Sequence, residues 1–374
     1  MNAESGRIVA ARELFRSDDL LVRQVAGFGG PVCYVTFASY TDERTLDRPG
    51  FGEEFFAARG IDAIHVLSRE NRWYQHPELM DALAAVATAS GGYARVIAYG
   101  SSMGGFAALR YGATCGATVG IALSPQFTVD PRIAPFDRRW AGDVARIAFR
   151  HDSHLPALAE QYIAYDPRDA CDRRHFALFA ARSPTKGVPV PYGGHPVGSY
   201  LSETEMLRPL LERVEAGDLD PEAHARELRH RRRRSGHYFY VLASNSPAHR
   251  PRTKLGLARL AAAAQPEMPI YRSELGHALD RVGDFDAGYA QHQAAIAMPR
   301  ANFYQTHYLM LHHELRGEYD YAIAIGDRLI AENPEVPWLR LERKRVRRKR
   351  RHLTWLGRLG GRLGLDGVLE RWLY

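Results

Sequence analysis

A Gly-x-Ser-x-Gly motif between a strand-like and a helix-like segment constrains the fold of this chain more than any other feature. Residues 96–105 read VIAYGSSMGG, in which Gly100, Ser102 and Gly104 form the motif, and FAALRY follows at 106–111. A strand and a helix can meet in so tight a turn only where glycines remove the side chains between the two backbones. In this context the motif predicts a parallel sheet with Ser102 on a strained turn above it, as a candidate nucleophile.

A glycine-rich turn of this kind can also occur without a catalytic role. It can bind phosphate at the N-terminus of the helix, or it can serve only to pack the strand against the helix. The motif is not a P-loop, because no Lys-Ser or Lys-Thr pair follows its glycines. The strand before the motif and the helix after it favour the catalytic interpretation.

Length and composition indicate a globular protein of more than one domain. The chain has 374 residues, of which 45% are hydrophobic and 25% charged, and this length suggests two domains. The cysteines Cys33, Cys115 and Cys171 are odd in number and far apart, so we expect a reducing compartment without a disulfide framework. Neither a signal-peptide pattern nor an apolar stretch of about 20 residues is visible, so we expect a cytoplasmic protein.

Strand-like and helix-like segments alternate over the first half of the chain, which predicts an α/β fold with a doubly wound, mainly parallel sheet. We expect strands at 20–26, 32–38, 61–67, 95–99 and 117–123, with shorter ones at 161–165 and 188–191, and helices at 51–58, 77–90 and 104–111. Residues 126–160 interrupt the alternation and predict a small helical cap. Residues 206–235 are polar and predict a helical linker.

We expect the first domain to span residues 1–205. From about residue 20 onward, this domain resembles the alpha/beta-hydrolase fold superfamily. In that family an acid and then a histidine follow the serine in chain order, each after a strand. Asp169 follows the strand expected at 161–165, and His195 follows the strand expected at 188–191. The resemblance implies Ser102 as nucleophile, His195 as base and Asp169 as the acid that orients the base.

The acid has alternatives. Many members of the family carry a Gly-x-x-Asp segment at this point, and here Asp166 stands where the glycine is usual. Asp166 is therefore an alternative acid, although it could equally be a turn residue before Pro167. Asp172 is a more distant candidate.

The oxyanion hole is implied by the same resemblance. One backbone N–H would come from Met103, the residue after the nucleophile, and the other from the loop after the second strand. That loop reads FASYT at 37–41 and lacks the His-Gly of many family members, so Ser39 or Tyr40 would supply the second N–H.

Trp73 and Tyr74 follow the strand expected at 61–67. Ligands of open parallel sheets bind beyond the carboxyl ends of the strands, so the two rings could stack on a substrate, including a sugar. The alternative is that they pack their loop onto the core.

From about residue 236 the sequence predicts helices only. A Gly-x-aromatic pattern recurs, with Gly283 and Phe285 in one copy and Gly317 and Tyr319 in the next. The period of about 34 residues resembles tetratricopeptide repeats, whose helix pairs bury their faces against their neighbours. We therefore expect repeats over 236–340 that dock a protein partner, with an unrelated helical bundle as the alternative.

Positive charge is concentrated near the end of the chain. The formal net charge is +7, and all but one of residues 343–351 are Arg or Lys. Leucines and tryptophans follow, so residues 341–374 predict a basic amphipathic tail. Such a run is commonly a solvated helix face, but it can also bind an anionic membrane surface, which would place the protein at the periphery of a membrane. Nucleic acid is not expected as a partner, because no recognition fold is visible.

Together these features predict a serine hydrolase that cleaves an ester or related acyl bond through a Ser-His-Asp triad and an acyl-enzyme. The substrate would be a small acyl ester or a glycan ester. Two alternatives stay open: a non-catalytic hydrolase-like scaffold whose repeats bind a protein, and a bacterial glycan esterase or acyltransferase. No cofactor is expected, and no metal site, because the 16 histidines form no His-Glu-x-x-His motif.

Overall fold

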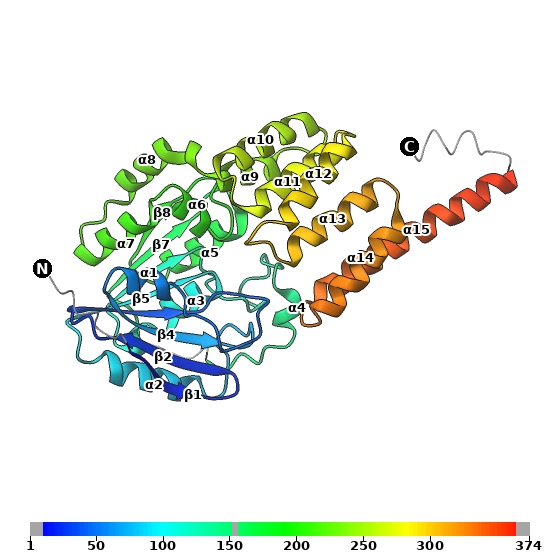
Figure 1. Cartoon of the computed structure of the whole chain (residues 1–374). Helices are drawn as coiled ribbons and strands as arrows, with labels where there is room; N and C mark the ends of the chain where they lie inside the picture. The colour runs from blue at the N-terminus through cyan, green and yellow to red at the C-terminus, as the bar shows by residue number, and fades with distance from the viewer. Residues whose placement is uncertain (1–9, 152–155, 364–374) are drawn as a thin grey trace, which may run out of the picture. The chain divides into compact units, whose positions relative to one another are not determined.

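The computed structural model describes residues 10–151 and 156–363, with side chains described as far as residue 354. The chain divides into two compact units, Met1–Arg232 and Arg233–Tyr374 (Figure 1). The segment expected to be a linker, 206–235, contributes two helices to the first unit. The predicted tail beyond residue 363 lies outside the described residues.

The first unit is built on one sheet, whose eight described strands run in the order β1-β2-β4-β3-β5-β6-β7-β8. The pairs β1–β2 and β2–β4 are antiparallel, and every other pair is parallel. This arrangement confirms the predicted α/β class with a mainly parallel sheet. The strands are β1 (Ala10–Arg16), β2 (Leu20–Ala26), β3 (Val32–Phe37), β4 (Asp62–Ser68), β5 (Arg95–Ser101), β6 (Val119–Leu123), β7 (Glu160–Tyr165) and β8 (Thr185–Pro189).

The central strands are buried on both faces because helices and loops cover the sheet. Every residue of β4 and of β6 is buried, which explains why their sequences do not alternate between apolar and polar residues. The helix α3 packs directly on β5 and β6. The helices of this unit are α1 (Glu53–Ala58), α2 (Leu79–Ser90), α3 (Met103–Tyr111), α4 (Ala141–Val144), α5 (Ala170–Ala180), α6 (Gly198–Glu203), α7 (Leu207–Ala216) and α8 (Pro221–Arg231).

The second unit is helical throughout its described residues (Figure 1). Helices that are neighbours in the chain pack together, as in the pairs α9–α10, α11–α12 and α13–α14. Gly283 and Gly317, the recurring glycines, lie between helices with φ of 86° and 80°, a backbone conformation that favours glycine. The helices are α9 (Gly236–Asn245), α10 (Pro251–Ala264), α11 (Pro269–Asp280), α12 (Phe285–Ile296), α13 (Phe303–Leu315), α14 (Tyr319–Glu332) and α15 (Pro337–Leu363).

The assignment of this unit to tetratricopeptide repeats stays a prediction. Among the described residues, no helix combines the length and the apolar character that crossing a membrane requires.

Candidate active site

Ser102 stands on the turn between β5 and α3, with φ of 50° and ψ of −116°. A positive φ is strained for a residue that carries a Cβ. A Cβ on Gly100 would overlap the backbone of Gly104, and a Cβ on Gly104 would overlap the carbonyl oxygen of Phe37. The two glycines of the motif are therefore required by the close approach of β5, α3 and the end of β3. The turn places Ser102 at the carboxyl edge of the sheet and at the N-terminus of α3.

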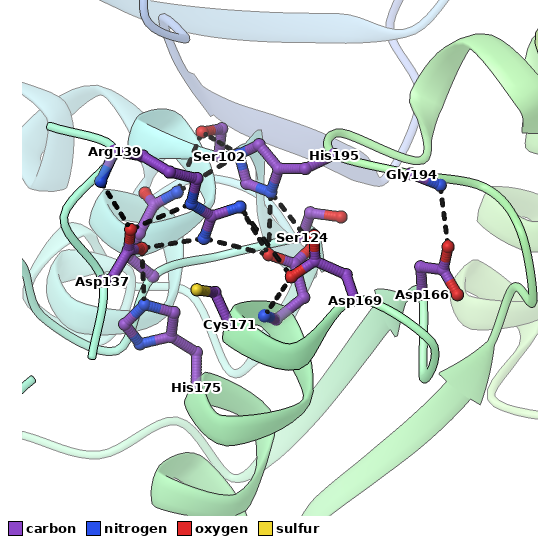
Figure 2. Close-up of polar contacts among 12 residues, drawn as sticks. Ser102, Ser124, Asp137, Arg139, Asp166, Asp169, Cys171, His175, Gly194 and His195 are labelled. Carbon is purple, nitrogen blue, oxygen red and sulfur yellow. Dashed lines mark hydrogen bonds and ion pairs between the residues drawn. The ribbon is translucent and has the colours of Figure 1, made fainter. Parts of the chain in front are cut away.

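His195 links Ser102 to an acid. Its Nε2 lies 2.9 Å from Ser102 Oγ, and its Nδ1 lies 2.9 and 3.0 Å from the two carboxylate oxygens of Asp172. Figure 2 shows the contact between Ser102 and His195. An ionised carboxylate can only accept, so Nδ1 carries the proton and Nε2 accepts a hydrogen bond from the Ser102 hydroxyl. The three side chains thus form one hydrogen-bonded chain, the arrangement that a Ser-His-Asp triad requires.

The acid that contacts His195 is Asp172, whereas the sequence favoured Asp169. Asp169 is the N-cap of α5, and its Oδ1 accepts the backbone N–H of Asp172 at 2.8 Å. The carboxylate of an N-cap residue is held by the free N–H groups of the helix, so it is not available to orient a histidine. Asp172 lies in the first turn of α5, and its side chain is 1% exposed against 31% for that of Asp169.

Asp166, the alternative acid, does not contact the ring of His195. It accepts hydrogen bonds from the backbone of the segment just before His195. Its Oδ1 accepts the N–H of Tyr192 at 3.1 Å, and its Oδ2 accepts the N–H of Gly194 at 3.0 Å (Figure 2). Burial raises the pKa of this carboxyl above its ordinary value, although these backbone hydrogen bonds act in the opposite direction. Asp166 therefore fixes the segment that ends at His195.

Arg139, from the segment 126–160, is a second partner of the acid. Its Nη1 and Nη2 lie 3.1 and 3.2 Å from Oδ1 of Asp172. Burial alone would raise the pKa of Asp172, but the hydrogen bond from His195, the charge of His195 and the charge of Arg139 outweigh it and lower the pKa. Asp172 is therefore ionised at neutral pH and keeps the imidazole in the tautomer described above.

A further His–Asp pair anchors Arg139. Asp137 accepts from Arg139 Nη2 at 2.7 Å and from His175 Nε2 at 3.0 Å (Figure 2). Nδ1 of His175 accepts the backbone N–H of Phe127 at 3.1 Å, which leaves the proton on Nε2. The segment 126–160, expected only to be a cap, therefore contributes a buried polar network behind the acid.

Gln126 contacts the nucleophile and was not singled out from the sequence. Its Nε2 lies 3.0 Å from Ser102 Oγ and 3.3 Å from His195 Nε2, and the side chain is fully buried. The indole N–H of Trp73, which can only donate, lies 3.1 Å from Gln126 Oε1. Because that oxygen accepts from Trp73, the NH₂ group must face Ser102. No motif surrounds Gln126, so only its place just after β6 could have drawn attention to it.

The structure brings the predicted oxyanion residues to the same strand ends as Ser102. Met103 is the first residue of α3, where backbone N–H groups have no partner within the helix. Ser39 follows β3, and its hydroxyl donates to the carbonyl oxygen of Ser101 at 2.9 Å. The side chain of Tyr40 donates to Asp143 Oδ2 at 3.1 Å. Which N–H groups bind an oxyanion stays a prediction.

Trp73 and Tyr74 are fully buried, so neither offers a ring face to a substrate, and packing of the loop explains both. The hydroxyl of Tyr74 donates to the carbonyl oxygen of Ala38 at 2.8 Å, deep between strands. Trp140 and Tyr40 both retain partial exposure here, and the ring centroid of Trp140 lies 6.0 Å from that of His195.

A cavity of about 440 Å³ opens beside the nucleophile turn. Its lining includes Ser39, Ser101 and Pro196, the residue that follows His195. The rest of the wall is largely aromatic and aliphatic, with Phe51, Phe55, Tyr99, Leu123 and Leu207, while Gly52, Gly198, Ser199 and Ser202 complete it.

Comparison with known proteins finds similarity at the level of structure alone. No family model matches the sequence, and no curated protein matches it. A capsule O-acetyltransferase of Neisseria meningitidis serogroup A is 13% identical, with a TM-score of 0.36, over 50% of this chain and 90% of that one. An alpha/beta serine hydrolase without lid from Xanthomonas campestris is 18% identical, with a TM-score of 0.31, over 49% of this chain and 84% of that one.

Proposed function

We propose that the protein is a serine hydrolase that cleaves an ester or related acyl bond. The observation that carries this proposal is the continuous hydrogen-bonded chain from Ser102 through His195 to Asp172, with its serine on a strained turn at the start of a helix. A packing turn would need the glycines but would not need a histidine and a buried acid aligned on the serine.

The proton path follows from the tautomer of His195. Ser102 Oγ attacks the acyl carbonyl carbon while its proton passes to Nε2 of His195. The same proton then moves from Nε2 to the leaving alcohol as the tetrahedral intermediate collapses to an acyl-enzyme. Water repeats the two steps and releases the acid. Asp172 remains ionised throughout and stabilises the imidazolium.

The apolar cavity supports an acyl group larger than acetyl. Its volume of about 440 Å³ lies within the range of small-molecule sites, and its aromatic and aliphatic wall suits a hydrocarbon chain. An acyl chain bound there would lie with its carbonyl end toward Ser39 and Ser101. The substrate class proposed is therefore a carboxylic ester with an apolar acyl part.

Acyl transfer to or from a glycan is the second candidate, because the partly exposed aromatic rings of Trp140 and Tyr40 lie close to the base. Trp140 is 6.0 Å from His195 and 4.9 Å from Tyr40, measured between ring centroids. Aromatic faces present a rigid apolar contact surface with a polar edge, which suits a sugar ring. A sugar hydroxyl placed there could receive the acyl group in place of water.

The test is covalent labelling with a fluorophosphonate probe, measured by intact mass on the purified full-length protein. We expect one adduct on the wild type, none on Ser102→Ala, and strongly slowed labelling of His195→Ala. Folded wild-type protein that forms no adduct, or Ser102→Ala protein that still forms one, would overturn the proposal. The scaffold hypothesis would then take its place, and partner capture by the helical unit would be the next experiment.

A further inference from the structure

Three side chains from three helices of the second unit meet in its interior. Asp280 lies at the end of α11, His292 in α12 and His312 in α13, and all three are buried. Asp280 Oδ2 is 3.0 Å from His292 Nε2, and Asp280 Oδ1 is 2.7 Å from His312 Nδ1. One ligand-type atom from each side chain lies within 4.8 Å of the other two. None of the three belongs to the candidate active site.

Hydrogen bonding does not account for this cluster. In the described part of the chain, Nδ1 of His292 and Nε2 of His312 are buried without a partner, as is Nδ1 of His277, one turn before Asp280 on α11. Buried polar atoms without partners are rare in native proteins, because each costs about 1–3 kcal/mol. A cluster kept only for its hydrogen bonds would be served by side chains with fewer unsatisfied nitrogens.

The charge of Asp280 also lacks an adequate partner. A buried carboxylate is strongly destabilising unless a cation or several donors compensate it. Among the described residues, its ion-pair partners are His292 and His312 alone. A histidine ring carries no permanent positive charge, whereas a divalent ion would supply one directly.

Two glycines make room for the cluster. A Cβ on Gly288 would overlap Oδ1 of Asp280, and a Cβ on Gly276 would lie 2.7–2.9 Å from ring atoms of His292. Contacts this short do not occur between real side chains, so the Asp280 carboxylate and the His292 ring can occupy these positions only because both residues are glycine. The space around the three side chains is therefore a built feature of the helices α11 and α12.

We propose that Asp280, His292 and His312 bind one divalent transition-metal ion, with zinc as the first choice. Two imidazoles and one carboxylate form a recurrent zinc ligand set, and the fourth position takes water or another side chain. Zinc bonds nitrogen and oxygen at about 2.0–2.2 Å, which puts the ligand atoms of a tetrahedral site roughly 3.3 Å apart. The two carboxylate–imidazole separations, 2.7 and 3.0 Å, would open by a few tenths of an ångström, and the ligand atoms of all three side chains lie within 4.8 Å of one another. The ion would take the place of the two hydrogen-bonding protons, and each neutral ring would keep its proton on its other nitrogen, Nδ1 of His292 and Nε2 of His312.

Such an ion would cross-link three helices and so stabilise the second unit. It would join α11, α12 and α13, which come from two successive helix pairs, by bonds stronger than the apolar contacts between them. Zinc binding would then raise the thermal stability of the second unit and leave the Ser102 site unaffected.

The experiment uses the full-length protein. Metal content is measured by mass spectrometry after purification, and zinc is then titrated by calorimetry into protein treated with a chelator. We expect one equivalent of zinc per chain and an increased melting temperature. Cobalt in place of zinc would give visible absorption bands of a four-coordinate site, and X-ray absorption of the zinc-loaded wild type would show nitrogen and oxygen ligands without sulfur.

The variant His292→Gln/His312→Gln should lose the bound metal and the cobalt bands. His313→Gln is the matched control, because His313 is adjacent on α13 but bonds to Glu318 at 2.6 Å instead of to Asp280. A second control, His76→Gln, removes a histidine from the other cluster of possible ligands, Asp19, His76 and Glu78. The proposal is wrong if the wild type binds no metal, or if the double variant binds it as the wild type does. Should the double variant fail to fold, the X-ray absorption spectrum of the wild type decides alone: sulfur ligands, or a site without imidazole, would overturn the proposal.

Discussion

Gln126 donates a hydrogen bond to Ser102, the proposed nucleophile, yet cannot take its proton. Its amide nitrogen lies 3.0 Å from Ser102 Oγ, and Trp73 fixes the orientation of the amide. The amide is therefore a fixed dipole beside the oxygen atom whose charge would change during attack. A donor held in this way costs no reorganisation when negative charge develops nearby, and that is the condition under which a hydrogen bond accelerates a reaction. We therefore expect Gln126 to act in the transition state more than in substrate binding.

Replacing Gln126 by Leu should lower kcat by roughly 10- to 1,000-fold and leave KM nearly unchanged, because the lost donor serves the transition state. Trp73→Phe, which removes only the N–H that orients the amide, should lower kcat less. Both constants are measured with a chromogenic ester, and labelling by the fluorophosphonate probe reports on Ser102 separately. Equal kcat values for wild type and Gln126→Leu would show that the amide only fills space.

The two aspartates of α5 offer a direct test of which one is the acid. Asp172→Asn should reduce kcat by about 10,000-fold, because an amide no longer holds His195 in the required tautomer. Asp169→Asn should leave kcat within a few-fold of the wild type, since Asn is an equally good N-cap. The comparison is made by steady-state kinetics at neutral pH. The opposite order of effects would restore Asp169 as the acid.

Among the individual site residues, the sequence predicted those that a local sequence pattern marks. The glycines around Ser102 and the chain order of the histidine suffice to single out Ser102 and His195, which the structure places in contact. Asp169 and Asp172 are three residues apart, and only the position of the first helical turn decides which is the cap and which faces His195. Gln126 and Arg139 come from a segment with little periodicity, so their approach to the site depends on tertiary structure.

The elements around the site follow the expected alternation, with one exception at the edge of the sheet. The strand β1 was not predicted because its sequence, AARELFR, is charged and lacks alternation. Such residues are typical of an edge strand, whose outer side faces solvent. Strand β8 begins a few residues earlier than expected, whereas β5 and α3 on either side of Ser102 match closely. The sequence therefore located best those elements that flank the glycine-rich turn, where local sequence restricts the backbone.

The helix α6 forms one wall of the apolar cavity, and its exposed Ser199 allows that cavity to be filled without burying a polar group. Ser199→Trp should lower kcat/KM for an octanoyl ester by about tenfold or more, and affect an acetyl ester little, because a bulky side chain competes with the long chain for space. Thr88→Trp, on the exposed face of α2, is the control. The assay is a chain-length series of nitrophenyl esters. Parallel losses for the short and the long ester would place the acyl group elsewhere.

For the whole molecule, the sequence predicted a division near residue 236, because a purely helical pattern follows there on a pattern of alternating strands and helices. The basic run was harder to interpret from sequence. In α15, Arg345 and Lys349 pair with Glu314, and Arg343 and Arg347 pair with Asp327. These acids come from α13 and α14, far from the run in sequence. A good part of the positive charge is thus neutralised within the second unit, and less of it is available to an anionic membrane surface than the composition suggests.

Buried neutral histidines in the first unit should make the whole protein sensitive to acid. Burial lowers the pKa of His65 and of His224 to about 4, from an ordinary value of 6.5. Between these values the unfolded chain binds more protons than the native one, so the free energy of unfolding falls as the pH is lowered, by up to about 3 kcal/mol per residue. Urea unfolding at pH 7 and at pH 4.5 measures the loss of unfolding free energy.

His224→Gln should show a smaller loss than the wild type, whatever its stability at pH 7, since Gln takes up no proton. His230→Gln, at an exposed position of the same helix, should show the loss of the wild type. If His224→Gln loses as much stability as the wild type, His224 is not a source of the acid sensitivity.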